Sequence, residues 1–159
     1  MTKLGDTAGR AAVAGYRTAP RNRHHPSTRV GTRSQGNEVT HAIALRDGWI
    51  ELRYTGVVDY AARMAALDDT ATLVRDTGIR RILADYTQAA LGDASDSASR
   101  QDYLSKAISA AVLEEADVAL IGLPPDHARA AELAGVVRNM RVRHFGDEAS
   151  ALAWLLSPT

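Results

Sequence analysis

The sequence predicts an α/β domain with a mostly parallel five-stranded sheet, an N-terminal hairpin and helices on both faces. Three observations lead to this prediction. A hairpin signal opens the patterned part of the chain, helical and strand-like patterns alternate after it, and one strand-like run is apolar on both faces. Alternating strands and helices imply parallel strands joined by crossover helices. A strand that is apolar throughout is typical of a sheet covered on both sides.

The hairpin is expected where two strand-like runs flank a short polar turn. The runs VTHAIAL (39–45) and WIELRYT (49–55) lie on either side of Arg46-Asp47-Gly48. Apolar and polar residues alternate in the second run, as in a half-buried strand. Asp-Gly between two such runs favours a tight turn, because both central residues of that turn need positive φ. The first strand is therefore expected to be antiparallel to its neighbour.

Four helices and three strands are expected after the hairpin. The first helix opens at Asp59, carries an apolar stripe at spacings of 4, 3, 4 and 3, and ends at Gly78, since glycine readily takes the left-handed conformation of a helix C-cap. The elements that follow are RRILADY (80–86), a helix to about Leu113, DVALIGL (117–123), a helix from Pro124, RVRHF (141–145) and a helix after Asp147.

The charge pattern separates the beginning of the chain from the rest. The formal net charge of the 159 residues is zero, but residues 1–40 carry a net charge of +5, which leaves −5 for the remainder. Residues 1–38 have few large aliphatic side chains, so they cannot bury enough apolar surface to offset the entropy of ordering. We expect a disordered basic tail at 1–38 and one domain at 39–157. The alternatives for the tail are contact with nucleic acid or an acidic membrane surface, a transit-like segment, and translation from a start that is not the natural one.

Composition and motifs exclude several classes of function. The chain has no cysteine, so disulfides, thiolate nucleophiles and Cys-ligated zinc are ruled out. Its apolar runs are too short to span a membrane, and its start lacks the hydrophobic core of a secretory signal. No catalytic constellation, phosphate-binding glycine loop or metal-ligand spacing is recognisable. We expect a cytoplasmic protein that is not an enzyme, with no catalytic residues, metal or cofactor.

The stretch DYTQAALGDASDS (85–97) is the candidate functional site. It leads from the expected end of a strand at Tyr86 into a helix. The first turn of a helix has unpaired N–H groups that favour a phosphate or carboxylate, and ligands bind at the carboxyl ends of strands in open α/β sheets. The alternative is that these residues only cap the helix and form turns. The candidate residues for binding a partner or carrying a phosphate are Asp85, Tyr86, Thr87, Asp93, Ser95, Asp96 and Ser97.

The layout resembles the STAS or SpoIIAA-like domain family, including its small STAS/SEC14-like bacterial members. The resemblance rests on the hairpin, helix and strand ILADYTQA, on the loop ALGDASDS and on the ending VRHFGDEASALAWLL, and it covers about residues 39 to 156. Family members of the anti-sigma-factor-antagonist type carry Asp-Ser-Ser-Gly in this loop, and a partner kinase phosphorylates the first serine. Asp93 lies where that aspartate would be, Ala94 stands in place of the acceptor serine, Ser95 follows it, and Asp96 replaces the glycine.

The resemblance implies a regulatory module that binds another protein, such as a kinase-like or anti-sigma-type regulator, and no specific nucleic acid. Because Ala94 replaces the usual acceptor, the serines left for phosphorylation are Ser95 and Ser97. The SEC14-like kinship implies an alternative, a carrier of a small apolar or lipid-like ligand. The many alanines on the expected helices leave room for a cavity, although alanine also simply favours helix.

Overall fold

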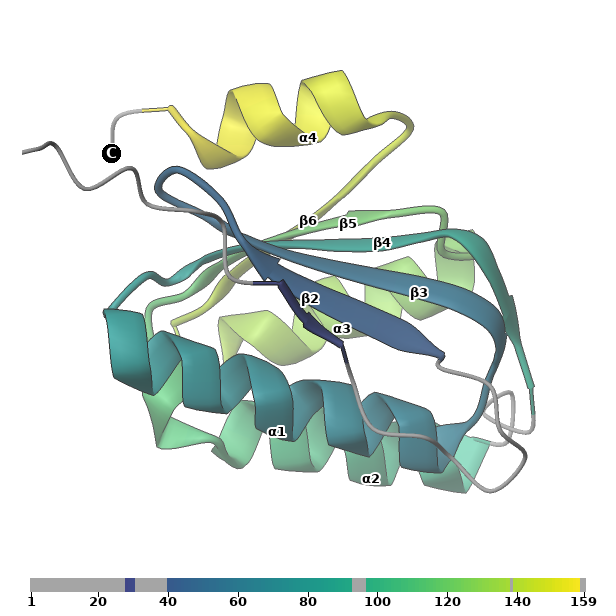
Figure 1. The fold of residues 1–159 in the computed structure, drawn as a ribbon. Coiled ribbons are helices and arrows are strands. Elements are labelled where there is room, and N and C mark those ends of the chain that lie inside the picture. The colour runs from purple at the N-terminus through teal and green to yellow at the C-terminus, as the bar shows by residue number, and fades with distance from the viewer. Residues whose placement is uncertain (1–27, 31–39, 93–96, 138, 158–159) are drawn as a thin grey trace, which may run out of the picture.

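The predicted α/β class is confirmed by a computed structural model that describes residues 28–30, 40–92, 97–137 and 139–157. One sheet runs through the molecule, with its strands in the order of the chain, and helices lie on both of its faces (Figure 1). The strands are β1 (Thr28–Val30), β2 (His41–Leu45), β3 (Ile50–Val58), β4 (Arg81–Leu91), β5 (Asp117–Ile121) and β6 (Arg141–Phe145). The helices are α1 (Tyr60–Thr77), α2 (Ser97–Ser109), α3 (Pro125–Val136) and α4 (Glu148–Leu155), with a 3-10 turn at η2 (Ala111–Leu113).

The N-terminal hairpin is formed by β2 and β3, which pair antiparallel, and β3 to β6 are parallel, as predicted. Gly48 in the hairpin turn has a φ of +85°, but Asp47 does not have a positive φ, so the expectation of positive φ at both central residues holds only for the glycine. All five predicted strands are present, and β1 adds a sixth that pairs antiparallel with β2. This strand lies within the segment expected to be a tail. The predicted boundary at residue 38 stays a prediction, because residues 1–27 and 31–39 are outside the described part of the chain.

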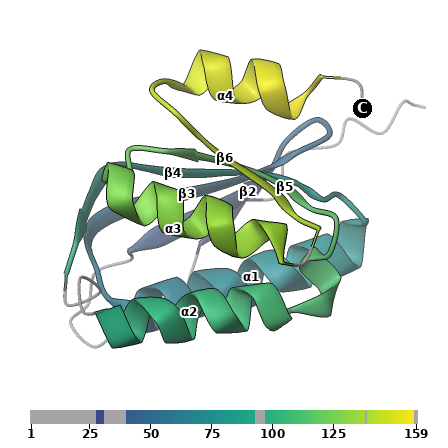
Figure 2. The same cartoon turned by 180° about the vertical axis from the view of Figure 1, so that it is seen from behind.

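Helices cover the two faces of the sheet unequally. Helices α1, α2 and α3 lie on one face, and α4 lies alone on the other (Figures 1 and 2). The main core fills the space between the sheet and the three helices, where Ile50 and Tyr54 of β3 are fully buried. A smaller core joins Leu83, Ala119 and Ile121 of the sheet to Ala151 and Leu155 of α4. Helix α4 has only eight residues, and the buried polar residues Glu51 and Asp85 lie on the same face of the sheet.

Helix ends follow the capping signals read from the sequence. Asp59 caps α1 by accepting a hydrogen bond from the backbone N–H of Ala62 at 2.7 Å, and Gly78 ends that helix at a φ of +72°. Asp147 caps α4 in the same way, accepting from the N–H of Ser150 at 2.8 Å. Both carboxylates satisfy first-turn donors that have no partner inside their helix.

Strand β4 is longer than the predicted strand at 80–86. It continues to Leu91, which pairs with Val58 at the end of β3. The pairing register changes on the way, because Arg53 pairs with Asp85 but Thr55 pairs with Gln88. Two residues of β4, Tyr86 and Thr87, therefore lie opposite the single residue Tyr54 of β3, which is a β-bulge.

The bulge explains why the sequence pattern ended the strand too early. Before the bulge, Ala84 and Tyr86 belong to the core under the three helices, and after it Ala89 and Leu91 pack against that core. The extra residue thus shifts the inward positions from even to odd numbers. A period-two pattern breaks at such a point, so the prediction that the strand ends at Tyr86 is wrong.

A glycine lets the end of β5 approach this bulge. Gly122 follows β5 with a φ of +76°, a conformation that L side chains rarely adopt. A Cβ atom at this position would lie 2.5 Å from the backbone nitrogen of Thr87 and 2.7 Å from the carbonyl carbon of Tyr86. The close contact between the two chain segments therefore requires glycine at residue 122.

Candidate functional site

The structure divides the predicted site residues among different environments. Asp85 and Tyr86 are buried, with 5% and 6% of their surface exposed, and they point to opposite faces of the sheet. Both side chains thus lie within the fold, and their predicted role in binding a partner stays a prediction. Ser97 is the first residue of α2. Asp93, Ser95 and Asp96 lie outside the described residues, so their role in a contact surface stays a prediction.

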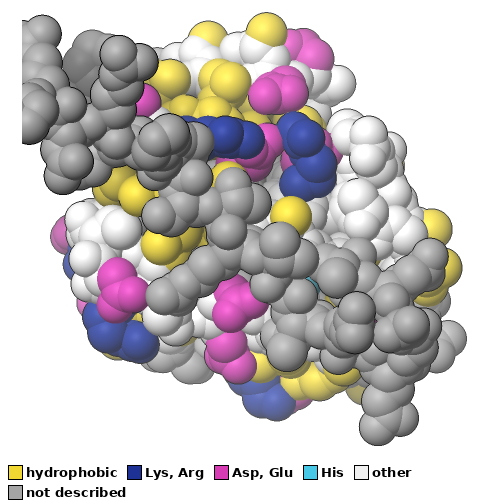
Figure 3. All heavy atoms as spheres, viewed as in Figure 1, with side chains coloured by type: hydrophobic (Ala, Val, Ile, Leu, Met, Phe, Trp, Pro, Cys, Tyr) yellow, Lys and Arg dark blue, Asp and Glu magenta, His cyan; other side chains and the backbone are white. Residues whose placement is uncertain are grey.

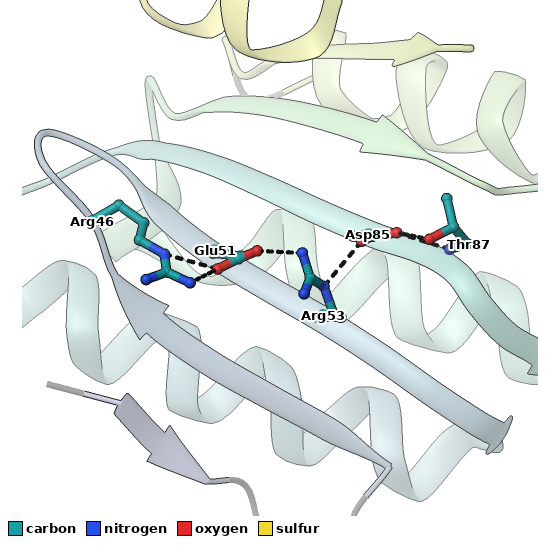
Figure 4. Close-up of polar contacts among 5 residues, drawn as sticks. All are labelled: Arg46, Glu51, Arg53, Asp85 and Thr87. Carbon is teal, nitrogen blue, oxygen red and sulfur yellow. Dashed lines mark hydrogen bonds and ion pairs between the residues drawn. The ribbon is translucent and has the colours of Figure 1, made fainter. Parts of the chain in front are cut away.

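Asp85 and Thr87 belong to a row of polar contacts on the α4 side of the sheet (Figure 4). Arg46 donates to Glu51 from Nε at 2.8 Å and also from Nη2, and Arg53 Nη2 donates to the second oxygen of Glu51 at 2.7 Å. Arg53 Nε donates to Asp85 Oδ2 at 3.1 Å. The row thus alternates between two half-buried guanidinium groups and two buried carboxylates. Basic and acidic side chains also lie next to one another beneath α4 in Figure 3.

This charge row has a structural role in the bulge. The other oxygen of Asp85 accepts a hydrogen bond from the backbone N–H of Thr87 at 2.8 Å and one from its hydroxyl at 2.6 Å. The bulge interrupts the ladder of the sheet, and the Asp85 carboxylate supplies an acceptor for a donor within it. Since both carboxylates in the row have oppositely charged partners, the row holds the strands in place and is already satisfied.

On the opposite face of the sheet, a cavity of about 130 Å³ lies between the sheet and helices α1, α2 and α3. Aliphatic side chains from the sheet and the three helices form most of its wall. Its polar features include Tyr54 of β3, Tyr86 of β4, Tyr103 of α2 and Arg63 of α1. Of the predicted site residues that the structure describes, only Tyr86 lines this cavity.

The tyrosines bring aromatic rings and neutral hydroxyls into the cavity wall. The rings of Tyr54 and Tyr86 are stacked, with centroids 4.3 Å apart and planes inclined by 18°. Burial raises the pKa of Tyr54 well above its usual value, and the neighbouring Tyr86 and Tyr103 raise it further. Burial likewise raises the pKa of Tyr86 and of Tyr103. The Tyr54 hydroxyl is buried and has no hydrogen-bond partner among the described residues.

Arg63 is the unusual residue of the cavity. Only 5% of its surface is exposed, and its guanidinium carbon lies 4.8 Å from the centroid of the Tyr103 ring. Within the described part of the chain, Nε and Nη2 have no hydrogen-bond partner and no carboxylate forms an ion pair with the group. A buried charge without a counter-ion is strongly unfavourable. The cavity therefore offers a positive charge that an anionic group would neutralise.

Sequence reasoning missed Arg63 and Tyr103, although a signal for the arginine exists. The predicted stripe of α1 contained Met64, Leu67 and Val74, whereas the residues that the structure buries include Arg63, Leu67, Thr70 and Val74. The buried set repeats at spacings of 4, 3 and 4, so an arginine lies on the inward stripe. A charged residue in such a position is the pattern that would have indicated a site.

The described part of the chain contains neither a metal-binding cluster nor a helix that could span a membrane. No group of three or more His, Cys, Asp or Glu side chains in that part of the chain is arranged to hold a metal ion. No helix among the described elements is both long and apolar enough to cross a bilayer.

Comparisons with known proteins find similarity in structure only. No protein-family model matches the chain, and no curated protein matches its sequence. The anti-sigma factor antagonist SpoIIAA in its unphosphorylated form is 10% identical, with a TM-score of 0.48 over 71% of this chain and 94% of that one. The phosphorylated form of SpoIIAA, the Bacillus cell fate determinant, is 13% identical, with a TM-score of 0.47 over 72% of this chain and 98% of that one.

A third solved structure with a SpoIIAA-like fold comes from Shewanella loihica PV-4. It is an uncharacterised protein of the DUF3478 family, is 18% identical, and has a TM-score of 0.47 over 82% of this chain and 95% of that one. The resemblance read from the sequence is thus found again as a likeness between folds. At these identities and TM-scores, the function of this chain has to be argued from its own residues.

Proposed function

We propose that this chain is a non-enzymatic binding module whose cavity takes a small apolar ligand, the carrier function that the SEC14-like resemblance implied. The observation that supports the proposal is the cavity of about 130 Å³ between the sheet and the three helices. An apolar cavity of about 150 Å³ in another protein stays dry and binds benzene. A cavity of similar size with an aromatic and aliphatic wall therefore suits an apolar molecule with about one ring.

A cavity-filling variant tests this proposal. Ala107 of α2 lines the cavity, and Ala107→Leu places three more carbon atoms into it. The matched control is Ala61→Leu on α1, because Ala61 is exposed. Native mass spectrometry of gently purified protein is expected to show a bound small molecule in the wild type and in the control, and less of it in Ala107→Leu. Equal ligand-free spectra for all three proteins, together with no thermal stabilisation by small aromatic compounds, would contradict the proposal.

A second candidate function is the regulation of another protein through the loop that leads into α2. Its support is the position of this helix. Ser97 begins α2, and Tyr103 and Ala107 of the same helix line the cavity, so a ligand there contacts the helix that follows the predicted phosphorylation loop. Phosphate at Ser95 or Ser97 would add negative charge at that end of the helix.

The regulatory function is tested by incubating the chain with extract of a bacterial host and ATP, then mapping phosphorylated residues and proteins that co-purify. We expect phosphate on Ser95 or Ser97 and a partner whose recovery changes in Ser95→Asp. The same pull-down without residues 1–38 tests whether the predicted tail contributes. A partner that binds wild type and Ser95→Asp equally, with no phosphate in the loop, would contradict this candidate.

A further inference from the structure

We infer that the ligand of the cavity is a small monocarboxylate with an aromatic or short apolar body, and that its carboxylate pairs with Arg63. This inference rests on the proposed function, because it names the ligand class for the same cavity. The cavity combines a wall that is mostly apolar with one buried cation on α1. A ligand that fits it must be apolar over most of its surface and anionic at one end.

The free donors of Arg63 favour a carboxylate as the anionic group. A guanidinium stays charged in proteins and presents its N–H groups in a planar fork that matches the two oxygens of a carboxylate. Two of its nitrogens, Nε and Nη2, have no partner among the described residues. Donors on these two nitrogens are adjacent in the fork, so one carboxylate can accept from both.

The charge of the cavity favours a single negative charge on the ligand. The three tyrosines are neutral near pH 7, because the pKa of a tyrosine is ordinarily about 10 and burial raises the pKa of each of these three further. One guanidinium neutralises one negative charge, and a dianion would leave a second charge unpaired against an apolar wall. The Tyr54 hydroxyl, which is buried without a partner in the described structure, is a further donor among the residues that line the same cavity. A monocarboxylate therefore fits better than a phosphate monoester.

The size of the cavity favours a short ligand. About 130 Å³ accommodates a body close to one aromatic ring, by comparison with a cavity of about 150 Å³ that holds benzene. Pockets for larger ligands usually measure about 300–1,000 Å³. The stacked rings of Tyr54 and Tyr86 form an aromatic wall against which a ring can pack. Benzoate has these properties, whereas a long-chain fatty acid is too large.

The test uses isothermal titration of the full chain at pH 7.5 with four probes: benzoate, benzyl alcohol, phenyl phosphate and palmitate. Benzyl alcohol has nearly the shape of benzoate but no charge, and phenyl phosphate is mostly dianionic at this pH. We expect benzoate to bind one to one and at least about tenfold more tightly than each of the others. Arg63→Met should lower benzoate affinity to that of benzyl alcohol, while Arg63→Lys retains part of the difference. Arg75→Met, at an exposed arginine of the same helix, should bind benzoate like the wild type.

A measurement on the wild type removes any dependence on the folding of the variants. The Nε–H resonance of Arg63 is expected to shift on titration with benzoate and to stay unchanged with benzyl alcohol. If benzyl alcohol binds as tightly as benzoate, or if that resonance does not respond to benzoate, the inference is overturned and the proposed apolar cavity stands. Tighter binding of phenyl phosphate or palmitate also overturns the inferred ligand class. If none of the probes binds, the inference and the proposed function both fail.

Discussion

Two buried charged residues of this protein differ in their partners. Asp85 accepts hydrogen bonds from Arg53 and from both donors of Thr87, so its charge and its lone pairs are satisfied. Arg63 is equally buried but has two unpartnered nitrogens among the described residues. A satisfied buried charge supports the fold, whereas an unsatisfied one lowers stability until a ligand neutralises it. Substitution of the two residues is therefore expected to have opposite effects on the free chain.

Replacing Asp85 with alanine should destabilise the protein. Asp85→Ala removes the acceptor for the backbone N–H of Thr87 in the bulge and one of the two carboxylates that pair with Arg53. The loss of a partner for a partly buried donor costs about 1–3 kcal/mol. Urea unfolding followed by circular dichroism measures the change, and Asp68→Ala, at an exposed position of α1, is the control. An unchanged unfolding midpoint would show that the carboxylate does not hold the bulge.

Replacing Arg63 with methionine should stabilise the free protein. Methionine keeps much of the apolar stem and removes a buried charge that has no counter-ion in the described structure. Exchange of buried ionic groups for apolar ones of similar volume is neutral or stabilising by about 1–4 kcal/mol. Calorimetric melting of Arg63→Met beside the exposed control Arg75→Met measures the difference. A lower melting temperature for Arg63→Met alone would indicate that the guanidinium already has a partner within the chain.

At the scale of elements, the bulge of β4 connects the two faces of the sheet. On the α4 side, Asp85 accepts a hydrogen bond from the backbone of the bulge. On the other side, the shift in pairing register after the bulge places Ala89 and Leu91 against the main core. The turn after β5 packs against the same bulge through Gly122. These contacts join β3, β4 and β5 at the end of the sheet where Tyr86 enters the cavity wall.

The contact at Gly122 predicts a strict requirement for glycine. Gly122→Ala would force an L residue to a φ of +76° and place its Cβ 2.5 Å from the backbone of Thr87. Strain of this kind costs about 1–3 kcal/mol, and the backbone overlap adds to it. Thermal unfolding should show a marked loss for Gly122→Ala and little change for Gly146→Ala, where an added Cβ meets nothing within 4 Å. Equal melting temperatures for the two variants would mean that β5 and the bulge are farther apart than the structure has them.

For the molecule as a whole, the free edge of the sheet at β6 is partly closed by a side chain. Glu132 of α3 accepts a hydrogen bond from the backbone N–H of His144 at 2.8 Å. Nearby on the same helix, Leu133 and Val136 are among the large apolar side chains that are most exposed. An open strand edge beside apolar surface is a template for pairing with another chain. The Glu132 carboxylate accepts from one backbone N–H of this edge, so that donor is not available to a second chain.

Removing that carboxylate should favour self-association. Glu132→Ala leaves the N–H of His144 open and lowers the negative charge beside the apolar side chains of α3. Sedimentation velocity over a range of concentrations is expected to show a larger average mass for Glu132→Ala than for wild type. Glu148→Ala, which removes an exposed carboxylate at the start of α4, should sediment like the wild type. If both variants sediment like the wild type, the edge is protected by something other than Glu132.

The sequence by itself determined the class of fold, the order of the elements from β2 onward, both ends of α1 and the start of α4. These features follow from periodicity and capping, which act between residues a few positions apart, as Asp59 and Ala62 do. The candidate site was predicted less well. Of the residues proposed for it, Asp85 and Thr87 belong to the charge row and Tyr86 lines the cavity, while the loop residues from Asp93 to Asp96 lie outside the described structure.

Only the tertiary structure decided the bulge, the charge row and the cavity with its buried arginine. Arg53 and Asp85 are 32 positions apart in the chain, and Arg63 meets Tyr103 across two helices. Such contacts depend on strand register and on how helices pack on a sheet. Local patterns of apolar and polar residues do not contain that information, because register and packing are set by side chains that come together only when the whole sheet has formed.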